Sequence, residues 1–115
     1  MVTRELCAAQ VGSGLLDVYA TPMMIALMEN VASTGVAEYL EEGQGTVGTK
    51  INVDHVSATP IGMKVTVEAE LVEVDRRRLV FSVKAFDEAG LIGEGTHERF
   101  IIDNEKFFSK AQGKL

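Results

Sequence analysis

Apolar residues repeat with a helical period in the first half of the chain. The repeating positions are Met24, Leu27, Met28, Val31, Val36, Tyr39 and Leu40. Thr21 followed by Pro22 is typical of a helix start, with Thr21 as the N-cap and proline at the first helical position. Gly43 suits a left-handed cap after the last turn. The pattern predicts a helix over residues 22–41. Because Pro22–Met28 is apolar nearly all round, this helix is expected to be buried in a core or wrapped by a sheet.

Beyond Gly43 the period of the apolar residues changes from helical to alternating. Apolar and polar side chains alternate in four segments, which are residues 46–58, 64–74, 79–86 and 91–102. Alternation is typical of a strand with one buried face, and its slip at Leu71-Val72 predicts a β-bulge. Turn residues separate the segments at 59–62, 75–78 and 87–90. Short turns between successive strands predict an antiparallel meander.

One helix followed by four antiparallel strands predicts an α+β fold, in which a curled antiparallel sheet wraps one long central helix. A chain of 115 residues is long enough for one hydrophobic core and too short for two. We therefore expect a single domain over residues 1–115. Residues 1–20 show too little periodicity to predict an element.

Composition excludes several classes of protein. A net charge of −6 argues against a nucleic-acid surface. The longest apolar stretch, Pro22–Met28, is far shorter than the roughly 20 residues of a membrane span, and no basic segment followed by an apolar one opens the chain as a secretion signal. A lone Cys7 cannot form an internal disulfide and indicates a reducing, cytoplasmic compartment. With one cysteine and two histidines at no ligand spacing, we expect no metal site.

Glu29 is a charged residue inside the apolar helix. The residues at helical spacing from it are Ile25, Ala26, Ala32 and Ser33, and none is a cation. Glutamate is almost never fully buried without a partner, so Glu29 is a candidate functional residue. The alternative is a glutamate at the exposed margin of a half-buried helix.

The two histidines differ in their surroundings. His55 lies on the apolar face of its strand and is the strongest candidate for a base near neutral pH, although such a histidine is also common in a core. We interpret His97 as structural, paired with a neighbouring carboxylate. Thr21 and Glu29 stand eight residues apart, about 12 Å along a helix. If both serve one site, the first helical turn is irregular or the site is completed across a two-fold interface.

Three groups of residues resemble one family. They are Ala20–Pro22 with Leu27–Glu29, Asn52–His55 with Ala58–Gly62, and Gly95–Arg99. Together they resemble the fluoroacetyl-CoA thioesterase-like branch of the hotdog-fold thioesterases, over nearly the whole chain. The resemblance implies a homodimer, or a higher oligomer, whose sheets join and whose acyl thioester lies at the dimer interface. Chains of this family usually begin with a strand, for which Met1–Glu5 leaves almost no room.

The resemblance also implies a set of site residues. The catalytic Thr, Glu and His of the family fall on Thr21, Glu29 and His55, and Gly48 falls on a position that lines the acyl pocket. His55 would act as the base, Glu29 would orient His55 or activate water, and Thr21 would attack the thioester or hold its carbonyl or a water.

Further residues are expected to bind substrate. Leu15, Leu16 and Met23 would set the depth of the acyl pocket. Arg77, in the turn Arg76–Arg78, would attract the phosphates of coenzyme A, or else the turn is simply solvated.

The implied activity is hydrolysis of a small acyl-CoA thioester, without a cofactor other than the coenzyme A of the substrate. A protein that only binds acyl-CoA or a small carboxylate is the alternative. A hydratase or dehydratase acting on acyl thioesters is a third possibility, although its usual motif is absent.

Overall fold

The structure, a computed structural model, describes residues 1–115. Its elements are a 3-10 helix Arg4–Leu6, α1 Ala8–Val11, α2 Thr21–Ala37, β1 Gln44–His55, β2 Thr66–Asp75, β3 Arg78–Asp87, β4 Gly90–Asp103 and α3 Asn104–Gln112. The predicted long helix and all four predicted strands are present. None of the helices is long and apolar enough to cross a membrane.

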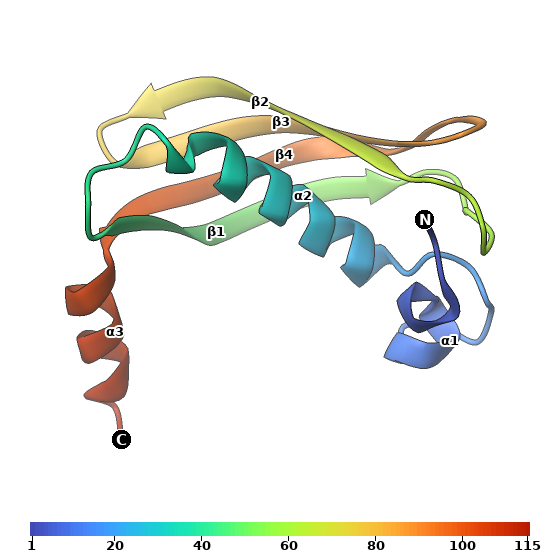
Figure 1. The fold of residues 1–115 in the computed structure, drawn as a ribbon, viewed down its shortest axis with the longest axis horizontal. Coiled ribbons are helices and arrows are strands. Elements are labelled where there is room, and N and C mark those ends of the chain that lie inside the picture. Colours follow the sequence, from blue (N-terminus) through green and yellow to red (C-terminus); the bar gives the residue numbers. More distant parts are fainter.

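The four strands form one antiparallel sheet in the order β1-β4-β3-β2 (Figure 1). Strands β2, β3 and β4 form the predicted meander, but β1 pairs with β4 and not with β2. The predicted turn at 59–62 is therefore not a hairpin, because it belongs to a connection that crosses from one edge of the sheet to the other. The predicted bulge is confirmed by a register shift between Leu71 and Glu73. A second register shift, between Gly48 and Lys50, interrupts β1.

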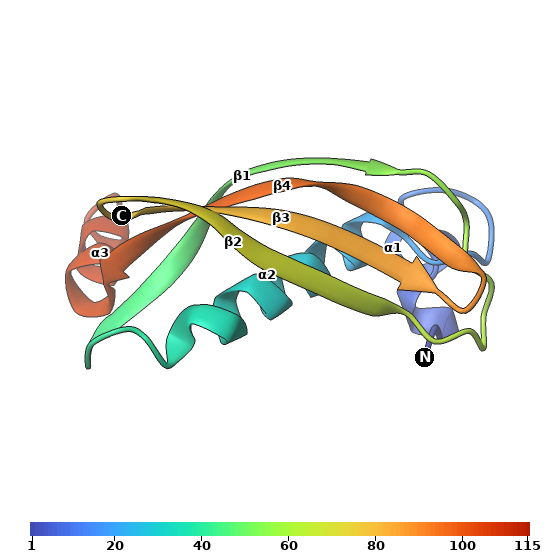
Figure 2. The same cartoon turned by 90° about the horizontal axis from the view of Figure 1, so that it is seen from above.

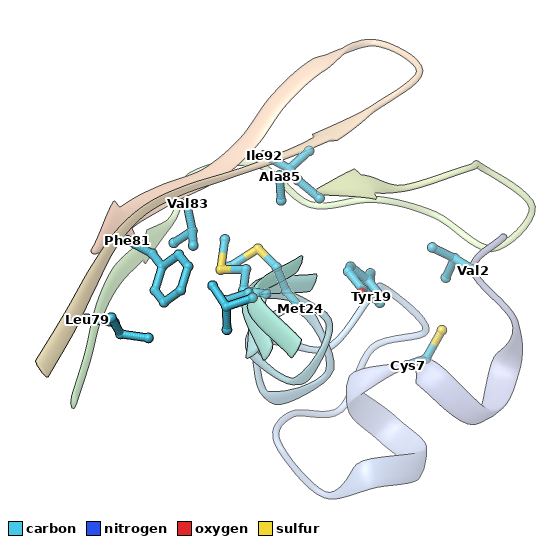
Figure 3. Packing of buried hydrophobic residues seen from close by; sticks show 12 residues of the cluster. Val2, Cys7, Tyr19, Met24, Leu79, Phe81, Val83, Ala85 and Ile92 are labelled. Atoms are coloured by element: carbon cyan, nitrogen blue, oxygen red, sulfur yellow. The ribbon is translucent and has the colours of Figure 1, made fainter. Parts of the chain in front are cut away.

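Helix α2 lies in the concave face of the curled sheet (Figure 2), as predicted. Its residues Met24, Met28, Ala32 and Val36 are buried at intervals of four, which places them in one stripe. They pack against inward-facing side chains of β3 and β4, among them Phe81, Val83 and Ile92 (Figure 3). This stripe is the core that holds helix and sheet together.

The ends of α2 differ from the prediction. Ala20 occupies the N-cap position and no side chain caps the helix, so the predicted N-cap role of Thr21 is wrong. The helix ends at Ala37, before the predicted residue 41. Gly43 does adopt a left-handed φ of 83°, but in the turn into β1. Glu41 and Glu42 would repel the negative C-terminal end of the helix dipole, which is consistent with a helix that stops before them.

Three helical segments outside α2 were not predicted: the 3-10 helix, α1 and α3. Helix α3 starts where the Asp103 side chain accepts a hydrogen bond from the backbone N–H of Lys106, which makes Asp103 an ordinary N-cap. The N-terminal helices are too short to show a period. They bury Cys7 and Tyr19, which pair across an isolated bridge, and so fix the segment that leads into α2.

Candidate active site

Thr21 and His55 meet where α2 begins and β1 ends. Thr21 Oγ1 lies 2.7 Å from His55 Nδ1, a short hydrogen bond between a hydroxyl and an imidazole. Both neighbouring segments are fixed by the backbone. The N–H of Tyr19 donates to the carbonyl of Thr59 at 2.8 Å, and the N–H of Val56 donates to the carbonyl of Ile92 at 2.7 Å. The structure thus brings together two of the three predicted catalytic residues.

An open cavity of about 380 Å³ adjoins this pair. Its lining includes Leu15 and Leu16 together with Thr21, Tyr19 and His55. The Leu15 side chain is almost fully exposed, so an apolar wall stands beside the hydroxyl and the imidazole. Leu15 and Leu16 therefore lie beside Thr21 and His55, and their role in binding an acyl group stays a prediction.

His55 is in a state suited to accept a proton. Burial lowers the pKa of His55 below its usual 6.5, and the backbone of Ser57 opposes this shift in part. The imidazole is thus predominantly neutral at pH 7. The hydroxyl of Thr21 can donate to Nδ1 when the ring proton is on Nε2, which is buried and has no hydrogen-bond partner. In this tautomer His55 can withdraw the hydroxyl proton.

Glu29 lies elsewhere, against Arg99 of β4. Arg99 Nη1 is 3.4 Å from Glu29 Oε2, and the guanidinium is held by Thr46, with Nε donating to Oγ1 at 2.8 Å and Nη2 to the carbonyl at 2.9 Å. Glu29 is 43% exposed, whereas Arg99 is 8% exposed. Glu29 has no cationic partner within its own helix, as expected, but it does have one in the structure. This partner is Arg99, which lies 70 residues away in the sequence. No contact joins Glu29 to Thr21 or His55 of the same chain.

Gly48 makes room for the Glu29 carboxylate. A Cβ at this position would lie 2.6 Å from Glu29 Oε2, 3.2 Å from His97 Cε1 and 3.3 Å from Arg99 Nη1. Glu29, Gly48 and His97 line a second cavity of about 200 Å³. The predicted role of Gly48 in a pocket thus coincides with a close approach that only glycine permits.

Arg99 was missed as a site residue. The sequence could have identified it, because alternate residues of a strand lie on the same face. Arg99 is two residues from both His97 and the apolar Ile101, so its charge is expected on the inward face. The prediction for His97 is wrong in detail. Its ring nitrogens face the Lys50 carbonyl and the Arg99 guanidinium, and no carboxylate.

Two predicted substrate-binding residues lie away from the Thr21–His55 pair. Met23 lines a separate, wholly apolar cavity with Val2, Leu6 and Val65, so the structure does not bring it to the Thr21 cavity. Arg77 is at the tip of the β2–β3 hairpin, at the end of the sheet opposite to the end of β1 (Figure 1). Its neighbour Arg78 is engaged in ion pairs with Glu73 and Glu98 at 2.6 and 2.8 Å. No group of three His, Cys, Asp or Glu side chains is arranged to hold a metal.

Several proteins similar to this chain are fluoroacetyl-CoA thioesterases. A family model described as fluoroacetyl-CoA-specific thioesterase matches residues 2–105. The fluoroacetyl-CoA thioesterase of Streptantibioticus cattleyicolor is 49% identical over 98 residues, or 85% of this chain and 70% of the relative. A solved variant of the fluoroacetyl-CoA-specific thioesterase FlK, in complex with fluoroacetate and CoA, superposes with a TM-score of 0.94 at 41% identity over 99% of this chain and 94% of that chain. A thioesterase superfamily member from Thermus thermophilus has a TM-score of 0.88 at 29% identity over 98% and 86%.

The fold and the matches define a hotdog-fold acyl-CoA thioesterase. Within that class, the chain belongs to the fluoroacetyl-CoA-specific thioesterase family. The resemblance noted in the sequence, the hotdog fold and the activity class are thereby confirmed. The roles of individual residues stay predictions.

Proposed function

We propose that the protein hydrolyses short acyl-CoA thioesters, fluoroacetyl-CoA among them, to a carboxylic acid and coenzyme A. The observation that carries the proposal is the 2.7 Å contact between Thr21 Oγ1 and His55 Nδ1 beside a cavity with an apolar wall. A hydroxyl and a neutral imidazole in contact are the parts that acyl transfer requires. The reaction takes only water and the thioester, with no resident cofactor.

In the proposed reaction His55 is the base and Thr21 is its partner. His55 takes a proton from the Thr21 hydroxyl, or from a water held by it, as that oxygen forms a bond to the thioester carbonyl carbon. The C–S bond then breaks and the proton passes from His55 to the leaving sulfur of coenzyme A. Where Thr21 itself attacks, a second cycle with water releases the acid. Glu29 orients the attacking water or polarises His55.

The exposed edge of β1 supports a homodimer that completes the site. The residues from Gly48 to Asn52 are exposed, although strand edges are normally protected. Gly48 and His55 are seven residues apart, about 23 Å along one strand. If two copies of β1 pair antiparallel about a two-fold axis near Ile51–Asn52, Gly48 of one copy stands opposite His55 of the other. Each site then combines Thr21 and His55 of one protomer with Glu29 of its partner.

A thiol-release assay on a panel of short acyl-CoAs tests the activity. We expect release of coenzyme A by the wild-type protein and loss of release in His55→Ala and Thr21→Val. Tight binding of acyl-CoA without release of coenzyme A would instead show that the protein only binds its ligand. A change in enoyl absorbance without thiol release would establish a hydratase or dehydratase.

Mixing two inactive variants tests the composite site. His55→Ala and Glu29→Gln are co-expressed, so that about half of the dimers are mixed and each of these holds one intact site. We expect recovery of about a quarter of the wild-type rate. No recovery, or a monomer by light scattering, would contradict a site shared between protomers.

A further inference from the structure

His97 is a buried histidine that the proposed reaction does not use. It is 1% exposed, and its ring stacks on Phe81 with centroids 6.3 Å apart. Both ring nitrogens are nevertheless engaged. Nδ1 lies 2.8 Å from the backbone oxygen of Lys50, and Nε2 lies 3.2 Å from Arg99 Nη1. A histidine that only filled space in the core would not need two polar partners on different strands.

The partners of His97 fix its protonation state. A backbone carbonyl can only accept a hydrogen bond, so Nδ1 must carry the proton. A guanidinium can only donate, so Nε2 must present its lone pair. The contacts are therefore satisfied together only by the neutral ring with its proton on Nδ1.

The Lys50 carbonyl is available because β1 is interrupted there. The register between β1 and β4 shifts between Gly48 and Lys50, so that Thr49 is not paired with a residue of β4 in the strand register. A bulge of this kind redirects the backbone and is common next to active sites. It brings Gly48 against Glu29 and lets the carbonyl of Lys50 receive the hydrogen bond from His97 in the same segment.

Arg99 Nη1 is shared between His97 and Glu29. It lies 3.2 Å from the histidine nitrogen and 3.4 Å from the carboxylate oxygen, while Nε and Nη2 are bound to Thr46. The Thr46 contacts hold one side of the guanidinium, and His97 holds the nitrogen that faces Glu29. We propose that His97 is a positioning residue, whose neutral ring holds Arg99 in place against Glu29 and connects this ion pair to the backbone of β1.

The inference rests on the proposed function of Glu29, and two conservative variants test it. Glutamine can place its amide oxygen where Nε2 stands, so His97→Gln keeps the acceptor for Arg99. Asparagine can place its amide N–H where Nδ1 stands, so His97→Asn keeps only the donor to Lys50. We expect His97→Gln to keep kcat within about threefold of wild type, and His97→Asn to lose about tenfold or more in kcat with KM within about threefold. Phe81→Leu, which weakens the packing around His97 without touching its nitrogens, is the control and should lower the melting temperature while leaving kcat nearly unchanged.

Equal kcat for the two histidine variants, or a wild-type kcat for His97→Asn, would overturn the inference. An inactive wild-type protein would refute the proposed function and not the positioning contact. For that case, and for variants that do not fold, nitrogen NMR of the wild-type protein measures the tautomer of the His97 ring directly. The assignment is simple because the chain has only two histidines. We expect the Nδ1–H tautomer for His97. An Nε2–H ring or an imidazolium at neutral pH would exclude the proposed contact with Arg99.

Discussion

Gly48→Ala is expected to damage the site without damaging the fold. The added Cβ would lie 2.6 Å from Glu29 Oε2, well inside van der Waals contact. The carboxylate would have to retreat by roughly 0.8 Å to reach an ordinary contact distance. Glu29 can do so, because the clashing atom is the end of a flexible side chain. Its contact with Arg99, already 3.4 Å, would be strained by the same movement.

The effect on activity follows from this displacement. Misplacing a catalytic group by about 1 Å can cost about 100-fold in rate, so a shift slightly below that should lower kcat by about 10- to 100-fold. KM should change little if Glu29 acts mainly in the transition state. The melting temperature should stay within a few degrees of wild type, since no backbone atom needs to move.

The measurement is a thiol-release assay beside a thermal melt, with two glycine controls. A Cβ at Gly35 of α2 meets nothing within 4 Å, so Gly35→Ala should keep full activity and gain up to about 1 kcal/mol from helix propensity. A Cβ at Gly95 would collide with the backbone oxygen of Asn52, so Gly95→Ala should lose stability and activity together. A Gly48→Ala protein with wild-type turnover would refute the placement of Glu29 at the reacting centre. A Gly48→Ala protein that fails to fold would refute the argument that the Glu29 side chain can move away from the added Cβ.

Four further predictions concern His55, Glu29 and the hydrogen bond between Thr59 and Asp87. His55→Ala should fold and lose about 10²- to 10⁴-fold in kcat, the usual contribution of a general base; equal losses of stability and activity would identify a core histidine. Because burial lowers the pKa of His55 and the neutral ring is the base, kcat/KM should fall on acidification with a midpoint below 6.5; a midpoint above 6.5 would contradict this assignment. Glu29→Gln should melt normally and lose most of its turnover, and wild-type turnover would remove Glu29 from the mechanism. Thr59→Val removes the buried hydroxyl that donates to Asp87 at 2.8 Å and should lower the melting temperature by several degrees, which a thermal melt will check.

Local patterns in the sequence were sufficient to predict the long helix and the four strands. The helix stripe at Met24 and Met28, the alternation in the four strands and the slip at Leu71 each depend on residues that are near neighbours in the chain. Helical and strand periods express which face of an element is buried. For this reason the helix, the strands and the bulge could be predicted. The ends of the helix were predicted less accurately. The Thr21 hydroxyl can either cap the helix or bind His55, and the sequence alone does not show which of the two occurs.

The partners of the site residues were decided by the tertiary structure. Whether β1 pairs with β2 or with β4 does not follow from alternation, since each strand offers the same backbone groups to any neighbour. The pairing with β4 brings Arg99 to Glu29 across 70 residues and puts His97 under the Lys50 carbonyl. The curl of the sheet around α2 sets the end of β1 against the start of the helix, where Thr21 meets His55. The sequence by itself therefore determined which face of each element is buried and which residues were candidates for the chemistry, whereas long-range packing alone decided which of these side chains touch.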